Sequence, residues 1–598
     1  MRVLFKNGTV VSGKGTRRAD VLVDGEKIQR VARDIHVDDA QVVDAAGMLL
    51  MPGFIDAHTH FDLDVCNTTT ADDFASGSRA ALRGGTTTIV DFACPNKGET
   101  LHDGLRLWHE KADGKCACDY GFHMTIDDWN DTIESEIDDM YAEGISSFKM
   151  YMTYPAMMIG DKLMYKALKK LKEKGGICGV HCENAGVIDA LIEEKKAAGE
   201  QGSVGCHPRT RPDFLEAEAV GRLLHIAEAV DIPVVIVHTT NAAALREIEA
   251  ARRRGQKVYV ETCPQYLVLD DSVYDNEDWL QAAKYVCAPP IRKAADRRAL
   301  WQAIRRGEVQ TVSTDHCSFT TAQKLAGRED FTTIPGGLPG VETRGELVYT
   351  FGVTTRKISL AAMCRVLAEN PARLYGMFPR KGIIAEGADA DIVVYDPAAD
   401  HVIRAEDMVG AADYNPYEGV VTKGSIKQVW LRGKLAVNEG RVLAGPDGKY
   451  IRRGNAMFDQ VCRELDVPFS RVGQYVCFQH GWLRPAVWCY CMWRKYHDGI
   501  SDTRLISGKE LLRREPNFNE KTRFAISNPD SGCVCPYGLT IAYAENAVQN
   551  GARIALNTAV LGMDVENGKI TAVHTNRGTL HPALVINAAG VFAEDVAR

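Results

Sequence analysis

Short runs of consecutive hydrophobic residues alternate, over about residues 86–315, with longer stretches in which hydrophobic residues recur at helical spacing. The short runs are typical of buried parallel strands and the longer stretches of amphipathic helices. The predicted strands are 87–92, 147–151, 177–181, 234–238, 257–261 and 311–315. Their regular strand-then-helix order predicts an α/β fold, a (β/α)8 TIM-like barrel rather than an open sheet.

The two flanks of this region have a different pattern. Residues 1–50 contain short β-type runs separated by Gly and Asp turns, and the segments 387–396 and 429–434 have the same character. We therefore expect an antiparallel β-unit at the start of the chain whose partner strands come from downstream. This predicts a β-sandwich domain built from 1–50 and 381–453, enclosing a barrel of residues 51–380.

Composition and charge exclude several functions. The chain has 598 residues, which predicts two or three domains, and 71 Lys and Arg against 79 Asp and Glu give a net charge of −8. That balance argues against a nucleic-acid-binding protein. No run approaches the apolar length of a membrane span, and the first residues lack the pattern of a signal peptide. We expect a cytoplasmic protein with no nucleic-acid or membrane partner.

Polar residues stand at or just beyond the ends of the predicted strands. His58 and His60 are two residues apart after a hydrophobic run, so on a strand they share one face. The full set is His58, His60, Lys149, His181, His238 and Asp315. Taken singly, these residues also fit satisfied core histidines, a snorkelling lysine and a helix cap. Because carboxyl-terminal strand ends of a barrel meet at one pocket, six together favour a metal site.

A lysine such as Lys149 in a buried predicted strand can be explained by carbamylation. A buried ammonium is costly unless its charge is removed, and carbamylation by carbon dioxide converts the amine into a carboxylate that bridges two metal ions. The four histidines and Asp315 then complete two sites, each with an open side.

Five motifs carry a resemblance to a known family. Residues 58–60, 148–154, 181–184, 237–240 and 313–317 resemble the motif set of the hydantoinase/dihydropyrimidinase branch of the amidohydrolase superfamily, and the similarity spans about residues 1–453. The resemblance implies two Zn²⁺ per chain. It makes His58, His60 and Asp315 ligands of one ion, His181 and His238 ligands of the other, and Lys149 the bridging N6-carboxylysine.

The resemblance also implies roles around the substrate. Tyr154 matches a tyrosine that hydrogen-bonds the substrate carbonyl, and Asp315 matches the residue that passes a proton to the leaving amide nitrogen. Ala288 and Gly336 stand where the family usually has Ser and Asn, so there we expect backbone groups to hold the ring. Segment 62–67 departs from the family, which leaves side-chain preference and enantiomer open. We expect a homotetramer or homodimer.

Residues 454–598 have another character. They begin with a predicted helix at 455–465 and resemble an FAD-dependent oxidoreductase similar to glycerol-3-phosphate dehydrogenase, in motifs at 505–510, 531–536, 544–547 and 585–590. No G-x-G-x-x-G turn lies in or just before this segment. We therefore expect a partial flavoprotein-like segment without FAD, joined through a gene fusion or a junction made in sequence assembly.

These observations favour a binuclear-zinc cyclic amidohydrolase that opens a hydantoin or dihydropyrimidine ring to an N-carbamoyl amino acid. Dihydroorotase is disfavoured by Asp62, which stands where that enzyme commonly has an Arg for the substrate carboxylate, and allantoinase by Tyr154. Two functions of a different class stay open: a non-catalytic scaffold with the same fold, and a flavin oxidoreductase.

Overall fold

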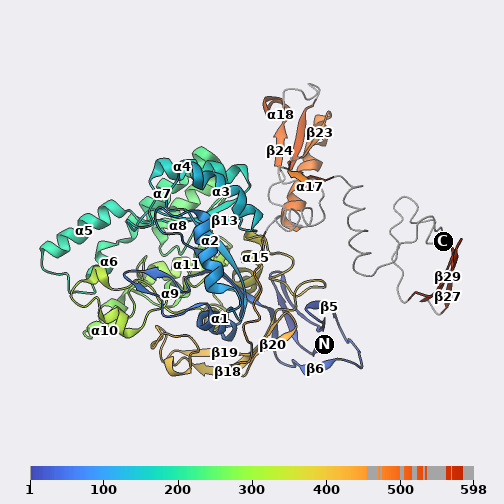
Figure 1. Cartoon of the computed structure of the whole chain (residues 1–598), viewed down its shortest axis with the longest axis horizontal. Helices are drawn as coiled ribbons and strands as arrows, with labels where there is room; N and C mark the ends of the chain where they lie inside the picture. The colour runs from blue at the N-terminus through green and yellow to red at the C-terminus, as the bar shows by residue number, and fades with distance from the viewer. Residues whose placement is uncertain are drawn as a thin grey trace. The chain divides into compact units, whose positions relative to one another are not determined.

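A computed structural model describes residues 2–453 and, beyond them, 469–471, 474–497, 504–514, 522–528, 532–534, 560–566 and 569–582 (Figure 1). The chain divides into two compact units, Met1–Met457 and Phe458–Arg598. The predicted helix at 455–465 and the motifs at 544–547 and 585–590 lie outside the described residues.

Eight parallel strands form the barrel of the first unit. In spatial order they are β8 (Phe54–Thr59), β11 (Thr86–Ala93), β12 (Asp119–Thr125), β13 (Ser147–Tyr151), β14 (Ile177–His181), β15 (Val234–Ile236), β16 (Val258–Thr262) and β17 (Thr311–Val312). A parallel bridge between Thr59 and His316 closes the ring, and the His60 amide donates to the His316 carbonyl over 2.8 Å. The predicted barrel is confirmed.

Strand β12 is absent from the sequence prediction. All seven of its residues are buried, but Asp119 and His123 interrupt the hydrophobic run. Their partners are distant in sequence: Lys381 Nζ lies 2.7 Å from Asp119, and Ser147 Oγ lies 2.6 Å from Nδ1 of His123. The residues next to β12 in sequence do not show that Asp119 and His123 have buried partners, so the strand could not be predicted from the local pattern.

Two strands are shorter than predicted. β15 ends at Ile236 and β17 at Val312. His238 and Asp315 have φ values of 34° and 53°, in the left-handed region that non-glycine residues rarely adopt. The backbone therefore leaves the strand conformation before it reaches each of these two site residues.

Helices alternate with the barrel strands, as Figure 1 shows around the first unit. Some of the longer ones begin with a side-chain cap; Asp73 and Thr100, for example, each form a capping box. The longer helices are α1 (Phe74–Arg83), α2 (Leu101–Ala112), α3 (Asp131–Ala142), α4 (Asp161–Glu173), α5 (Ala185–Ala197), α7 (Asp213–Val230), α8 (Ala242–Arg253) and α11 (Ala294–Arg306). Shorter helices include α6 (Cys206–Thr210), α9 (Pro264–Val268), α10 (Trp279–Ala283), α12 (Thr321–Leu325), α13 (Arg344–Val348), α14 (Leu360–Cys364) and α15 (Asn370–Leu374).

Both ends of the first unit meet in one sheet. Its seven strands run in the order β21 (Arg441–Val442), β20 (Lys434–Asn438), β19 (Val421–Leu431), β18 (Ile392–Val402), β7 (Leu49–Pro52), β2 (Thr9–Ser12) and β3 (Gly15–Arg18). A four-stranded sheet has the order β5 (Lys27–Ala32), β4 (Asp20–Asp24), β1 (Arg2–Lys6) and β6 (Gln41–Asp44). A shared apolar core that includes Phe5, Leu50 and Trp430 joins the two, so the sandwich is confirmed.

The antiparallel expectation for residues 1–50 is wrong in part. β1 pairs with β6 in parallel, and β2 pairs with β7 in parallel. The sequence alternation of each run is the same for either direction, so it could not reveal this.

The second unit is described in parts. It contains helices α17 (Arg484–His497) and α18 (Gly508–Arg514) and a three-stranded sheet of β23 (Gln474–Phe478), β25 (Phe524–Asn528) and β24 (Arg504–Ser507). Strand β22 (Phe469–Arg471) pairs with β26 (Gly532–Val534), and β27 (Val560–Glu566), β28 (Lys569–Thr575) and β29 (Gly578–Leu580) form another sheet. In the described part of the chain, no helix has the length and apolar character to cross a membrane.

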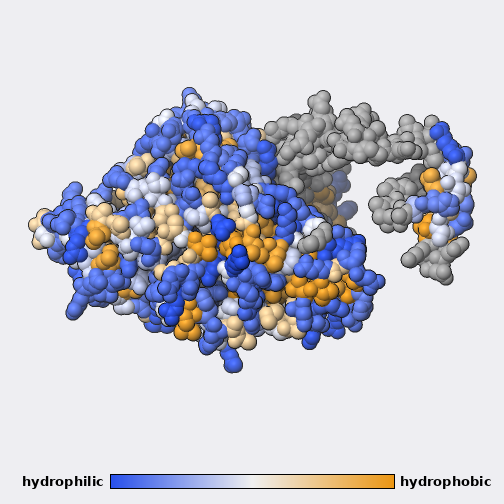
Figure 2. All heavy atoms as spheres, turned by 60° about the horizontal axis from the view of Figure 1, so that its bottom comes forward, coloured by the Kyte–Doolittle hydropathy of each residue, from blue (hydrophilic) through white to orange (hydrophobic). Residues whose placement is uncertain are grey.

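The face of the first unit seen in Figure 2 is largely hydrophilic, with hydrophobic residues gathered in patches between hydrophilic ones. Exposed large hydrophobic side chains of the first unit include Val42, Phe214, Val421 and Leu443.

Candidate metal centre and active site

All the predicted metal ligands and substrate-binding residues line one cavity of about 820 Å³. His58 lies near the end of β8, Lys149 in β13 and His181 at the end of β14, whereas His60, His238 and Asp315 follow β8, β15 and β17. Tyr154, Ala288 and Gly336 line the same cavity from the loops. The structure thus brings together every residue of the predicted site.

His58, His60 and Asp315 form one cluster, in which three ligand atoms lie within 4.8 Å of one another. Nε2 of each histidine is 3.1 Å from Oδ1 of Asp315. Nε2 of His58 is buried and makes no hydrogen bond with any of the described residues. Buried polar atoms are normally hydrogen-bonded, so this orphaned nitrogen fits a metal ligand.

Glu261 orients His58, a role that the sequence did not reveal. Its Oε1 lies 2.5 Å from Nδ1 of His58, and both side chains are buried. A carboxylate on one ring nitrogen fixes the tautomer and leaves the other nitrogen for a metal. The only sequence signal is that Glu261, like the predicted ligands, ends a predicted strand.

His181 and His238 form the second cluster. Their ring centroids are 4.5 Å apart, and the His238 ring lies 5.5 Å from that of His58. Nε2 of His181 is 2.7 Å from Oε2 of Glu183, which leaves Nδ1 for a metal. Burial by itself raises the pKa of Glu183, but the charge of Arg211 and the hydrogen bond with His181 lower it to about 2. Glu183 is therefore a carboxylate at neutral pH.

Lys149 has the environment that carbamylation requires. Its Nζ is buried without a hydrogen-bond partner among the described residues. The atom lies 4.9 Å from the ring centroid of Phe92 and 5.0 Å from that of Tyr151. Burial lowers the pKa of the Lys149 amine, which increases its neutral, nucleophilic fraction. The donor set around it fits two metal ions bridged by a modified lysine.

Asp315 and Tyr154 are both held in left-handed backbone conformations, with φ values of 53° and 69°. Burial by itself raises the pKa of Asp315, but His58 and His60 hold it well below its usual range. Burial raises the pKa of Tyr154, so its hydroxyl keeps its proton. The Tyr154 ring lies edge-on to His181 with centroids 5.1 Å apart. The cavity thus presents a proton acceptor and a hydrogen-bond donor.

Lys324 joins the two loops that carry Ala288 and Gly336. Its buried Nζ donates to the carbonyl oxygens of Val286, Pro335 and Gly337 over 2.8, 2.6 and 2.9 Å. A Cβ added at Gly336 would meet only the Ala288 amide nitrogen, at 3.9 Å, so the position has room for a side chain. Lys324 was not predicted, because its three acceptors are main-chain atoms.

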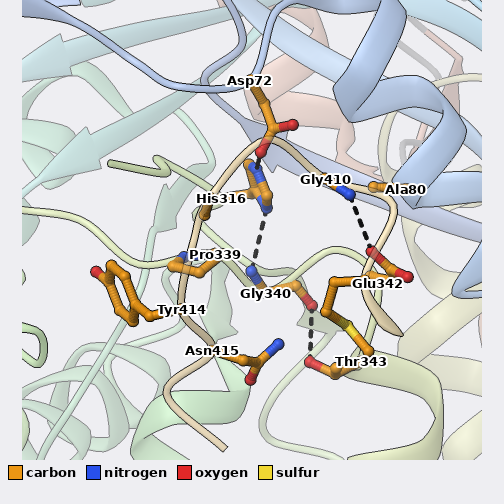
Figure 3. A pocket seen from close by; sticks show the side chains of 12 residues that line it. Asp72, Ala80, His316, Pro339, Gly340, Glu342, Thr343, Gly410, Tyr414 and Asn415 are labelled. Carbon is orange, nitrogen blue, oxygen red and sulfur yellow. Dashed lines mark hydrogen bonds and ion pairs between the residues drawn. The ribbon is translucent and has the colours of Figure 1, made fainter. Parts of the chain in front are cut away.

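His316 fixes the chain directly after Asp315 (Figure 3). Its Nε2 lies 3.0 Å from Oδ2 of Asp72, and its Nδ1 accepts from the Gly340 amide over 3.1 Å. Glu342 on the same small cavity accepts from the Gly410 amide over 3.3 Å. The cavity has a volume of about 20 Å³, enough for one water molecule.

Comparison with known proteins assigns the chain to a family. The model of the amidohydrolase family matches residues 49–436. The chain belongs to the amidohydrolase family. This amidohydrolase is 41% identical to a D-hydantoinase of Geobacillus stearothermophilus over 77% of the chain and 99% of the relative. It is 42% identical to a D-hydantoinase of Ralstonia pickettii over 76% of the chain and 99% of the relative.

A solved structure agrees with these sequences. The dihydropyrimidinase of Brevibacillus agri NCHU1002 superimposes with a TM-score of 0.75 at 42% identity, over 76% of this amidohydrolase and 99% of that chain. The predicted hydrolase of the hydantoinase and dihydropyrimidinase type is confirmed by these relatives.

A second family model, the FAD dependent oxidoreductase, matches residues 421–598 of this amidohydrolase. The predicted resemblance of the C-terminal segment is confirmed. The match begins at residue 421, in β19, whereas the structure places that strand in the seven-stranded sheet of the first unit. Motif 505–510 spans β24 and the start of α18.

Proposed function

We propose that the chain hydrolyses the ring amide of hydantoins or dihydropyrimidines and releases N-carbamoyl amino acids. The observation that carries this proposal is the convergence of four imidazoles, Lys149 and Asp315 in one cavity beside Tyr154. The relatives named as D-hydantoinases and a dihydropyrimidinase support the class of ring.

Two zinc ions would be held by the buried donors. His58, His60 and Asp315 suit one ion, His181 and His238 the other, and a carbamylated Lys149 supplies a carboxylate to both. When bound, such ions polarise the substrate carbonyl and lower the pKa of water.

Asp315 and Tyr154 supply the chemistry of the chain itself. As a carboxylate, Asp315 accepts a proton from the attacking water and passes it to the ring nitrogen. The new C–O bond forms, the ring C–N bond breaks, and the transferred proton neutralises the leaving nitrogen. Tyr154 donates its hydroxyl proton in a hydrogen bond to the carbonyl oxygen as negative charge develops there.

The substrate ring would lie against the main chain of the loops at Ala288 and Gly336, which line the same cavity as the metal ligands. Because Lys324 holds these loops through three carbonyl groups, their amide groups keep a defined orientation. Strands β9 (Asp64–Val65) and β10 (Thr68–Thr69) form a short hairpin. In and beside it, Leu63, Val65 and Cys66 line the cavity and would contact the side chain of the substrate.

A substrate panel tests the proposal. Purified protein loaded with zinc and bicarbonate should open 5-substituted hydantoins or dihydrouracil, detected as N-carbamoyl products, and should contain two zinc ions per chain. Each hydantoin is tested as both enantiomers. Faster hydrolysis of dihydroorotate or allantoin than of every hydantoin would contradict the substrate class. If protein with two bound zinc ions hydrolyses no substrate of the panel, the result would favour the non-catalytic scaffold.

The cellular location, the oligomeric state and the domain boundaries are also part of the proposal. We propose a cytoplasmic homotetramer or homodimer in which residues 51–380 form the barrel, 1–50 and 381–453 the sandwich, and 454–598 a separate segment without FAD. Light scattering of the purified protein measures the oligomer, and the absorption spectrum measures bound flavin.

A further inference from the structure

Arg211 connects two parts of the site. It follows α6 directly and lines the cavity, with 12% of its side chain exposed. Its Nη1 donates a hydrogen bond to Oε2 of Glu183 over 2.7 Å, and its guanidinium carbon lies 5.5 Å from the ring centroid of Tyr154. A planar cation beside an aromatic ring favours one ring orientation. Arg211 therefore contacts both a buried carboxylate and the proposed oxyanion donor.

Glu183 contacts both Arg211 and the proposed metal ligand His181. The same Oε2 that accepts from Arg211 lies 2.7 Å from Nε2 of His181, and 1% of the Glu183 side chain is exposed. A carboxylate this deeply buried needs its partners, because an unpaired buried charge is strongly destabilising. Loss of Arg211 would remove one of the two hydrogen bonds of Glu183 Oε2, so the carboxylate that orients the His181 imidazole would be held less firmly.

Arg211 is itself held from the other side. Arg292 donates through Nη1 to the Arg211 carbonyl, through Nε to Oγ1 of Thr240 over 3.0 Å, and through Nη2 to Glu216 over 3.1 Å. Thr240 follows His238 by two residues, and its amide donates to Glu216 over 2.9 Å. One buried network thus runs from His181 to the segment of His238 and passes through Arg211.

We propose that Arg211 is a positioning residue for the hydrolysis: it holds the ring of Tyr154 and, through Glu183, the imidazole of His181. The inference rests on the proposed function for its kinetic part, whereas its structural part concerns the geometry of the second metal site alone. The guanidinium of Arg211 makes one contact with Glu183 and another with Tyr154. Two different substitutions of Arg211 can separate the effects of these contacts.

Arg211→Met removes both contacts, and Arg211→Lys keeps a charge for Glu183 but not the planar group beside Tyr154. In the full chain, Arg211→Met should lower kcat and the affinity for the second zinc ion by about 10- to 100-fold each, with KM little changed. Arg211→Lys should recover zinc affinity and not kcat. Zinc affinity is measured by competition with a chelator, and circular dichroism verifies that each variant is folded.

Arg209→Met is the matched control. Arg209 lies two residues away in α6, is 61% exposed and is 4.0 Å from Glu200, so its replacement should leave kcat and both zinc affinities at wild-type values. If the wild-type protein opens no ring, the proposed function fails, and the zinc affinities of Arg211→Met still decide the inference. Wild-type zinc affinity in Arg211→Met, together with wild-type kcat wherever the parent is active, would overturn it.

Discussion

Nζ of Lys324 lies 2.6 Å from the carbonyl oxygen of Pro335, and the whole side chain is buried. The other two acceptors, Val286 and Gly337, belong to the same pair of cavity loops. One ammonium group thus connects the loop before Ala288 to the loop around Gly336 by hydrogen bonds to both.

The burial of Lys324 makes the stability of the chain depend on pH in the alkaline range. Burial lowers the pKa of Lys324 from 10.5 to about 8 in the folded chain. Between these values the unfolded chain binds a proton that the folded chain has lost, so the free energy of unfolding should rise with pH, by roughly 1.4 kcal/mol per unit from this group. Urea unfolding of wild type and Lys324→Met, at several pH values from 7 to above 10, should show the steeper rise in wild type. Equal slopes would contradict the prediction.

Lys149→Ala should abolish hydrolysis and lower the zinc content below two ions per chain. The reason is that the proposed bridge needs an amine that carbon dioxide can carbamylate. Lys149→Arg should not restore activity, because a guanidinium does not form the carbamate. Metal analysis after loading with zinc and bicarbonate provides the measurement, with Lys166→Ala on the exposed face of α4 as control. Two zinc ions in Lys149→Ala would disprove the bridge.

Tyr154→Phe should lower kcat by about 100-fold, the usual cost of removing one oxyanion donor. The ring that packs against His181 is kept, so zinc content should stay at the wild-type value. Steady-state kinetics on the best hydantoin measures the effect, and Tyr165→Phe at an exposed position of α4 is the control. A normal kcat would remove Tyr154 from the mechanism.

Glu261→Ala should weaken zinc binding at the first site by about 10- to 100-fold, because Nδ1 of His58 would lose the carboxylate that orients it. Glu261→Gln keeps an acceptor oxygen and should have a smaller effect. The ratio of zinc affinities in the two variants, measured by chelator competition, tests whether the carboxylate acts through orientation. Identical affinities in both variants and wild type would exclude that role.

Truncation after Arg453 should keep hydrolysis, whereas truncation after Gly440 should not. The amides of Ile451 and Arg453 donate to the carbonyls of Tyr120 and Gly144 over 2.6 and 3.0 Å, so the barrel needs these residues. The specific activity of both shortened chains measures this.

The full chain should purify without the absorption bands of flavin, because its sequence has no G-x-G-x-x-G turn in or just before the C-terminal segment. Stoichiometric flavin would show that the segment matched as an FAD dependent oxidoreductase binds the cofactor.

Much of the site was predictable because its residues stand at strand ends. His58, His60 and His181 follow or end hydrophobic runs, and barrel topology brings such positions to one face whatever their distance in sequence. Lys149, which was predicted at a strand end, lies instead in the middle of β13. The strands themselves were predictable wherever the run was unbroken. β12 was missed because Asp119 and His123 interrupt it.

The supporting contacts were not predictable from local pattern. Arg344 is an example: its Nη1 donates to the carbonyls of Ile55 and Val312 over 2.9 and 3.0 Å, across the point where the barrel closes. Nothing near Arg344 in sequence indicates these acceptors. Glu183 and Glu261 also become recognisable as supports only once the ligand that each one contacts is placed.

The pairing of β7 with β18 has a consequence for how the protein is made. Leu50 pairs with Val394, so the strand that emerges from the ribosome among the first residues finds its neighbour only after the whole barrel has been synthesised. At roughly 5–20 residues per second, that delay is on the order of tens of seconds. During it the edge of β7 and its apolar face lack their final cover, and long-range pairings of this kind form slowly. The time during which the barrel is synthesised, rather than the finished enzyme, is thus when β7 is most open to pairing with another chain.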